Sequence, residues 1–272
     1  MAFDVDLYLH RIGRDGGSAG APATLETLTE LMRAHVRAIP FENLDPVSGR
    51  PPSLELDDIA AKLVAGGRGG YCYEHNTLFA AVLAELGFDV TLHAGRVVVG
   101  ARVATERPRT HMLLLVHLAD EPAPYLADVG FGSIGSLLEP IRLTPGATLE
   151  DAPRSHRLVR TLAPAAAKWM LQAHDEDEWA DQYLFTEEQY FAPDFKMFNW
   201  YVATYPTSPF RNAPYVQRTF PDRHLALDGR TLTETDGAGK QLVRELSDHD
   251  EVVAVLRAEF GIRVPDYFAS PA

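Results

Sequence analysis

Apolar residues follow two different patterns, and the change between them comes near residue 87. Before this point they recur at helical spacing, most clearly between Thr24, which can cap a helix, and Pro40, which cannot continue one. After it, short β-rich runs alternate with Pro, Gly and Asp turns, as in an antiparallel sheet or barrel. We therefore expect helices at residues 4–12, 24–39, around 59–63 and at 72–86, and strands at 90–99, 111–118, 125–131, 156–162, 168–174 and 182–186.

The last third of the chain mixes both patterns. We expect a helix at residues 194–203, hairpins within 216–235 and a helix at 248–260 with Val252 and Leu256 inward. Helices, then strands, then a mixed segment predict an α+β protein. The sequence contains no internal repeat.

Composition and charge narrow the possible functions. The chain has 272 residues, of which 46% are hydrophobic and 23% charged, as is usual for a soluble protein. Its net charge of −13 argues against a nucleic-acid or an anionic-membrane surface. The sequence shows neither a secretory signal nor an apolar run of about 18 residues, so we expect a cytoplasmic protein.

The one cysteine, Cys72, lies in the run Arg68-Gly69-Gly70-Tyr71-Cys72-Tyr73-Glu74-His75-Asn76. A single thiol forms neither an internal disulfide nor a cysteine-rich metal site, and H-E-x-x-H is absent, so no metal is expected. Cys72 follows a glycine-rich bend and begins an expected helix, where free N–H groups stabilise a thiolate, and Arg68 adds positive charge. A cysteine that only packs in a core needs none of these features, so Cys72 is interpreted as a nucleophile.

Two downstream residues could activate this thiol. His111 begins an expected strand, and Asp128 lies near the end of the next one. If the two strands pair as antiparallel neighbours, His111 faces the region of Asp128, which could hold the imidazole in one tautomer. His75 is an alternative, because it lies three residues after Cys72 on the same helical face. The residues alone leave this choice open.

A second motif suggests a different chemistry. Residues 130–135 match G-x-G-x-x-G, with Glu150 at roughly the distance expected for a ribose contact. The dinucleotide-binding fingerprint requires these glycines to begin a helix. Pro140 and Pro145 interrupt the segment that follows, so we do not expect a dinucleotide-binding loop.

Further motifs accompany the run around Cys72. They are Leu9-His10-Arg11-Ile12-Gly13, Ile39-Pro40-Phe41-Glu42-Asn43-Leu44, Thr110-His111, Asp128-Val129-Gly130-Phe131-Gly132, Asn199-Trp200-Tyr201 and Ser208-Pro209-Phe210. In this order the set closely resembles the arylamine N-acetyltransferases over about the first 210 residues, and the rest matches in general character only. The resemblance favours His111 over His75 as the partner of Cys72.

The resemblance implies a three-part fold with a cysteine-protease-like Cys-His-Asp arrangement. An N-terminal helical bundle would span residues 1–86, a central antiparallel β-barrel 87–188 and a C-terminal α/β lid 189–272. It also implies ping-pong acetyl transfer from acetyl-CoA, through acetyl-Cys72, to the nitrogen of arylamines, arylhydrazines or arylhydroxylamines. Acetyl-CoA is then a co-substrate, and no cofactor is bound permanently.

The resemblance further assigns roles to single residues. Cys72, His111 and Asp128 would be catalytic, and Arg11 and Glu42 would form a structural ion pair near the nucleophile. The residues expected to bind the substrate are Phe41, Tyr73, Thr110, Phe131 and Phe210, and those expected to contact coenzyme A are Gly130 and Ser208.

Other functions share parts of this pattern. A specialised amide synthase would use the same triad on a carrier-bound acyl chain, and a Cys-His-Asp hydrolase would act without coenzyme A. A non-enzymatic nucleotide-binding module would keep its ligand after Cys72→Ala. As partners we expect only small molecules, without nucleic acid or membrane, for a monomer or homodimer.

Overall fold

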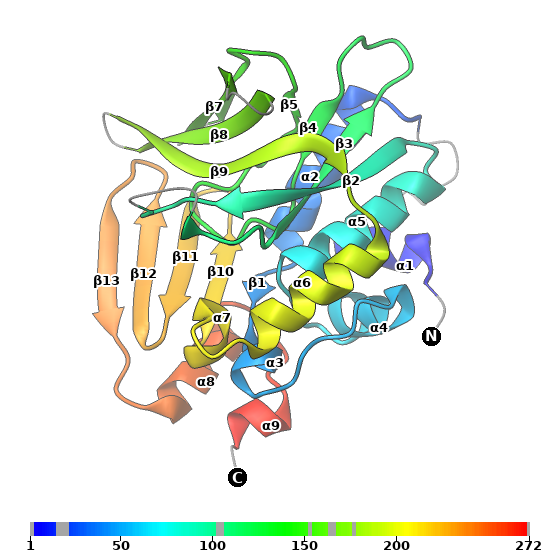
Figure 1. The fold of residues 1–272 in the computed structure, drawn as a ribbon. Helices are drawn as coiled ribbons and strands as arrows, with labels where there is room; N and C mark the ends of the chain where they lie inside the picture. Colours follow the sequence, from blue (N-terminus) through cyan, green and yellow to red (C-terminus); the bar gives the residue numbers. More distant parts are fainter. Residues whose placement is uncertain are drawn as a thin grey trace.

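The N-terminal part of the chain is helical (Figure 1). The computed structural model describes residues 3–14, 22–101, 106–151, 154–162, 167–175 and 178–270. Thr24 caps the second helix, because its hydroxyl accepts the N–H of Thr27, and that helix ends before Pro40. The helices here are α1 (Val5–Arg11), α2 (Leu25–Ala38), α3 (Leu44–Val47), α4 (Leu56–Ala60), its π-helical continuation η1 (Ala61–Ala65) and α5 (Cys72–Glu85).

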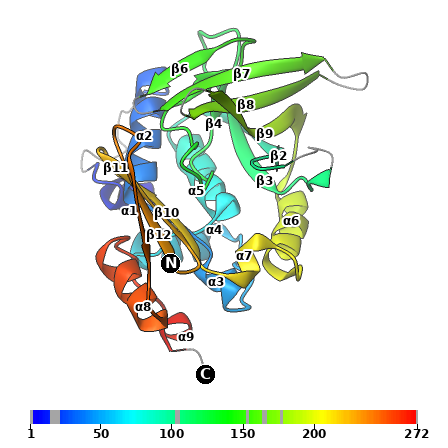
Figure 2. The same ribbon diagram turned by 90° about the vertical axis from the view of Figure 1, so that its left-hand side faces the viewer.

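The middle of the chain forms one antiparallel sheet of eight strands. Their order is β5-β4-β3-β2-β9-β8-β7-β6. The outermost strands β5 and β6 are separated by only residues 143–147, so the sheet curls into a nearly closed barrel (Figure 2). The strands are β2 (Asp89–Val97), β3 (His111–His117), β4 (Tyr125–Ala127), β5 (Ile141–Arg142), β6 (Thr148–Asp151), β7 (Arg154–Leu162), β8 (Ala167–Asp175) and β9 (Glu178–Gln189).

A second antiparallel sheet follows, in the order β1-β10-β11-β12-β13. Its strands are β1 (Phe41–Glu42), β10 (Tyr215–Thr219), β11 (Arg223–Asp228), β12 (Thr231–Asp236) and β13 (Gln241–Glu245). The helices near it are α7 (Pro209–Asn212), α8 (His249–Ala258) and α9 (Asp266–Ala269). Helix α6 (Ala192–Thr204) comes before this sheet in the chain and packs in the main apolar core through Phe195 and Val202. Val216, Leu225 and Leu227 pack with α8 in a separate apolar core. Because β1 comes from the N-terminal part, the C-terminal sheet is completed by residues 41–42.

These elements confirm the α+β prediction and most of the expected long elements. The expected strand 125–131 is shorter, because the chain leaves the sheet after Ala127. No helix begins at residues 130–135, in agreement with the rejection of a dinucleotide-binding loop. The elements that the pattern did not predict are short or lie at a sheet edge: α3, α7, α9, β1, β5, β6 and β13.

The main apolar core joins the N-terminal helices to the barrel. Helix α5 packs against β2 and β3, so the first residue of α5 lies close to the first residue of β3. This packing brings Cys72 to His111. Among the described residues, no helix is both long and apolar enough to cross a membrane.

Candidate active site

Cys72 is the first residue of α5 and is 5% exposed. Its thiol points to the backbone oxygen of Thr110, at 3.8 Å. The preceding glycines are needed for packing: a Cβ on Gly69 would overlap the carbonyl of Pro40, and one on Gly70 would meet the carboxylate of Glu74 at 2.5 Å. That carboxylate accepts the N–H of Tyr71 at 3.1 Å and so caps the helix that carries the thiol.

His111 and Asp128 lie beside this thiol. Strands β3 and β4 pair antiparallel as expected, with Leu114 opposite Ala127. The Nε2 atom of His111 lies 2.6 Å from Oδ2 of Asp128, and both side chains are buried. The Cys72 thiol lies at the backbone oxygen of Thr110, the residue directly before His111, and its interaction with the ring raises the pKa of His111. The structure thus brings the three predicted catalytic residues together in the expected order.

The rival histidine does not contact the thiol in this way. Nε2 of His75 lies 3.2 Å from the carbonyl oxygen of Pro40, and its Nδ1 lies 2.8 Å from Nε2 of His35. Both ring nitrogens of His75 therefore have partners away from Cys72.

The electrostatics of the pair favour a charged imidazole. Burial lowers the pKa of His111, but the carboxylate of Asp128 and the thiol of Cys72 outweigh this and raise the pKa to about 10. Burial raises the pKa of Asp128, and the charge and hydrogen bond of His111 turn the net shift downward. An imidazolium beside the thiol stabilises a thiolate, which is the reactive form of cysteine.

These shifts predict a pH-dependent stability. Because the pKa of His111 is raised from 6.5 to about 10, its contribution to the free energy of unfolding is complete below about pH 6.5 and is lost as the pH rises toward 10. We expect the difference in Tm between the wild type and Asp128→Asn to be largest near pH 6 and to shrink steadily toward pH 10. Thermal unfolding followed by circular dichroism at several pH values measures this difference, and a pH-independent difference would contradict the ion pair.

A shell of polar groups holds Asp128. The side-chain amide of Asn76 donates to Oδ1 of Asp128 at 3.0 Å, and the N–H of Gly130 donates to the same atom at 3.0 Å. The buried ring of Tyr183 packs against His111, with centroids 4.9 Å apart. Neither Asn76 nor Tyr183 is among the site residues predicted from the sequence. The position of Asn76, one helical turn after Cys72, is a signal that could have identified it.

Aromatic side chains surround the reacting groups. The ring of Phe131 packs against His111, with centroids 5.2 Å apart. The rings of Phe41 and Phe210 contact each other, with centroids 5.8 Å apart. The ring of Phe210 also contacts that of Tyr71, the residue directly before Cys72, with centroids 6.1 Å apart. These contacts gather three of the predicted pocket aromatics, Phe41, Phe131 and Phe210, near the triad.

The remaining predicted residues occupy different positions. The hydroxyl of Tyr73 donates to the carbonyl of Thr110 at 2.7 Å, and Tyr73 is fully buried, so its ring belongs to the core. Gly130 lies directly against the Cys72 backbone, where a Cβ would come within 2.8 Å of the Cys72 Cα atom. Ser208 is buried at the start of α7, and its carbonyl accepts from the side chain of Asn212 at 3.1 Å.

The charged groups around Arg68 correct two expectations. Arg68 is buried and pairs with Glu42 at 2.7 Å and with Asp45 at 2.8 Å. Its charge is compensated by these carboxylates rather than directed at Cys72. Arg11 is not the partner of Glu42 expected from the resemblance: its guanidinium donates to the carbonyl oxygens of Leu63 at 3.1 Å and Ala38 at 2.8 Å. The ion pair near the nucleophile is therefore formed by Arg68 and Glu42.

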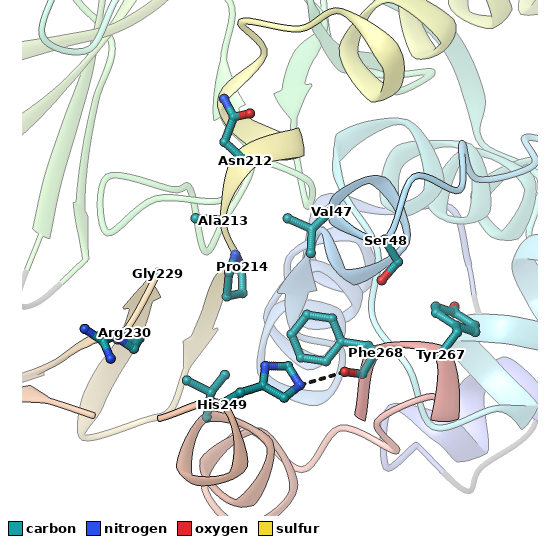
Figure 3. Close-up of a pocket in the computed structure, with 11 residues that line it drawn as sticks. Val47, Ser48, Asn212, Ala213, Pro214, Gly229, Arg230, His249, Tyr267 and Phe268 are labelled. Atoms are coloured by element: carbon teal, nitrogen blue, oxygen red, sulfur yellow. Dashed lines mark hydrogen bonds between the residues drawn. The ribbon is translucent and has the colours of Figure 1, made fainter. Parts of the chain in front are cut away.

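A separate cavity of about 560 Å³ lies between α3, α8, α9 and the segment before β10 (Figure 3). Its walls include Val47, Asn212, Arg230 and His249, whose Nε2 donates to the carbonyl of Phe268 at 2.7 Å. No predicted catalytic or substrate-binding residue lines it. In the described part of the chain, no group of three or more His, Cys, Asp or Glu side chains could hold a metal ion.

Comparison with known proteins agrees with this geometry. A sequence model of the N-acetyltransferase family matches residues 24–268. The arylamine N-acetyltransferase of Mycobacterium tuberculosis (strain ATCC 25618 / H37Rv) is 39% identical over 268 residues, which cover 98% of this chain and 92% of that protein. The chain belongs to the arylamine N-acetyltransferase family. The family member of Escherichia coli (strain K12) is 36% identical, with 94% of this chain and 89% of that protein covered.

Solved arylamine N-acetyltransferase structures have the same fold. That from Nocardia farcinica superimposes with a TM-score of 0.90 at 40% identity and covers 99% of this chain and 94% of its own. The Mycobacterium marinum enzyme, solved in complex with CoA, gives a TM-score of 0.87 at 38% identity and covers 95% and 93%. The family assignment therefore holds along nearly the whole chain, including the C-terminal part that matched only in general character.

Proposed function

We propose that this protein transfers the acetyl group of acetyl-CoA to the nitrogen of arylamines, arylhydrazines or arylhydroxylamines in a ping-pong reaction through acetyl-Cys72. The observation that carries the proposal is the buried pair of His111 and Asp128, which lies beside the Cys72 thiol at the first residues of β3 and α5. The full-length similarity to arylamine N-acetyltransferases supports the acetyl donor and the class of acceptor.

In the first half-reaction, the Cys72 thiolate attacks the acetyl carbonyl carbon of acetyl-CoA. The bond from that carbon to the coenzyme A sulfur breaks, and the leaving thiolate takes the proton of the His111 imidazolium. Asp128 holds the ring through Nε2, which leaves the other ring nitrogen for proton exchange at the sulfur. The N–H groups of Cys72 and Tyr73, in the first helical turn of α5, are suited to bind the oxyanion.

In the second half-reaction, the acceptor nitrogen attacks the thioester carbon of acetyl-Cys72. His111 takes a proton from the attacking nitrogen, the bond to the Cys72 sulfur breaks, and the amide leaves. The thiolate and imidazolium are thereby restored. The aromatic rings of Phe41, Phe131 and Phe210 offer apolar surface for the acceptor and reduce the access of water, which would hydrolyse the thioester. Contacts of Gly130 and Ser208 with coenzyme A belong to the same proposal.

Intact-protein mass spectrometry tests the nucleophile directly. With acetyl-CoA alone, we expect the protein to gain one acetyl group, located by peptide mapping on the peptide that contains Cys72. Addition of an arylamine should remove this group and yield the N-acetyl product. Cys72→Ala is the control and should stay unmodified. An unmodified wild type would refute the acetyl carrier, and an acetyl group lost equally fast to water without an amine would indicate a hydrolase.

A further inference from the structure

A chain of buried hydrogen bonds lies behind the nucleophile and connects four elements. The hydroxyl of Tyr8 on α1 lies 2.8 Å from Nδ1 of His35 on α2, and Nε2 of His35 lies 2.8 Å from Nδ1 of His75 on α5. Nε2 of His75 lies 3.2 Å from the carbonyl oxygen of Pro40, directly before β1. All three side chains are at most 1% exposed. The proposed reaction uses none of them.

The direction of each hydrogen bond follows from its last acceptor. The Pro40 carbonyl can only accept, so Nε2 of His75 carries the proton. Burial lowers the pKa of His75 to about 4, so the ring is neutral and its Nδ1 accepts from Nε2 of His35. Burial likewise lowers the pKa of His35, whose Nδ1 must then accept the hydroxyl proton of Tyr8. Each ring nitrogen thus has one assigned role, and the chain has a single proton arrangement.

The row of hydrogen bonds from Tyr8 to Pro40 ends next to Phe41, one of the aromatic residues around the candidate site. The ring of Phe41 lies parallel to that of His75, at an interplanar angle of 6° and a centroid distance of 6.2 Å. On its other sides Phe41 contacts Phe210 and Tyr215, and Gly132 leaves no room for a Cβ beside it. The backbone of Phe41 is held by its pairing with β10, and the orientation of its ring depends on the Pro40 carbonyl and the stacked His75 ring on one side and on these packing contacts on the others.

The contacts that hold the catalytic triad do not involve Tyr8, His35 or His75. Asp128 is held by Asn76 and by the N–H of Gly130, and Cys72 packs against Gly130 and the Thr110 carbonyl. Loss of the His75 hydrogen bonds would therefore disturb the wall at Phe41 more than the contact between thiol and imidazole.

We propose that His75, oriented by His35 and Tyr8, is a positioning residue for Phe41 and thereby sets the efficiency of the acceptor half-reaction rather than that of acetylation. The proposal rests on the proposed function. In a ping-pong reaction, kcat/KM for acetyl-CoA reports only the first half-reaction, and kcat/KM for the amine reports only the second. The two constants separate a specific effect on the acceptor from a general loss of structure.

Two variants at His75 differ in the bond that they preserve. Glutamine can place its amide N–H near the former Nε2 and donate to the Pro40 carbonyl, whereas leucine has a similar volume and no polar atom. We expect His75→Leu to lower kcat/KM for an arylamine roughly tenfold, while kcat/KM for acetyl-CoA stays within about twofold. His75→Gln should recover most of the loss.

Two further variants complete the test. Tyr8→Phe removes only the first donor of the chain, and we expect a smaller loss of the same selective kind, even if His75→Leu fails to fold. Val82→Ala changes another fully buried residue of α5, one that takes no part in the hydrogen bonds from Tyr8 to Pro40. It should lower Tm without changing the ratio of the two kcat/KM values.

Two results would overturn the positioning role: equal losses in both half-reactions, or unchanged acceptor kinetics in folded His75→Leu and Tyr8→Phe. The proposed function is tested separately by the wild type. If the wild type forms no acetyl-enzyme and acetylates no amine, the proposed function fails before any variant is compared.

Discussion

Asp128→Asn is expected to fold and to form the acetyl-enzyme about 10⁴ times more slowly than the wild type, as for the matching change in a Ser-His-Asp triad. Oδ1 of Asp128 accepts from both Asn76 and Gly130, so an asparagine would place its oxygen there. Its NH₂ group would then point at Nε2 of His111. That nitrogen would have to accept, which moves the ring proton to the nitrogen beside the Cys72 thiol, where it blocks proton transfer from sulfur.

The rate of acetylation, followed by quenched-flow mass spectrometry, measures this effect. Asp120→Asn is the matched control, because it makes the same chemical change at an exposed turn before β4 and should leave the rate unchanged. Near-normal acetylation of a folded Asp128→Asn protein would show that the orientation of His111 does not depend on this carboxylate.

Gly130→Ala should produce the second largest effect, a loss of about 10²-fold in the rate of acetylation, with a lower Tm. A Cβ at this position would lie 2.8 Å from the Cα atom of Cys72 and 2.7 Å from the side-chain nitrogen of Asn76. The added methyl group would be confined between the Cys72 backbone and the Asn76 amide, which is hydrogen-bonded to Asp128. The first turn of α5 must therefore shift and carry the thiol away from His111.

Gly237→Ala provides the comparison for this substitution. A Cβ there meets only the carbonyl oxygen of Asp222, at 3.6 Å, which is an ordinary contact. We expect this variant to match the wild type in acetylation rate and nearly in Tm. If Gly130→Ala were acetylated as fast as Gly237→Ala, the close approach of the two backbones would not determine the position of the nucleophile.

The sequence predicted those features that depend on local signals. The helix at Cys72 was predicted from the glycine-rich bend before it, and the structure adds that Glu74 caps it. The approach of His111 to Asp128 follows from the antiparallel pairing of two strands that are consecutive in the chain, so it required no knowledge of the whole fold. The choice between His111 and His75 needed the resemblance, because both lie at spacings that a triad could use.

Features that depend on distant parts of the chain could not be predicted in this way. The two residues of β1 become a strand only because they pair with β10, more than 170 residues later. Arg68 suggested a positive charge beside the thiol, but its partners Glu42 and Asp45 lie in a segment whose fold the local pattern does not determine. Tyr183 reaches the site from β9, a strand that carries no motif.

Because Cys72 is the only cysteine, thiol chemistry on this protein is stoichiometric. One equivalent of an alkylating reagent consumed corresponds to one reactive centre, so the fraction of competent molecules in a preparation can be counted without a substrate. The thiol is nearly buried, so the reagent has to reach it past neighbouring side chains. The labelling rate then reports how accessible the Cys72 thiol is. If an added compound slows the labelling, the decrease measures how much of the protein has that compound bound near Cys72.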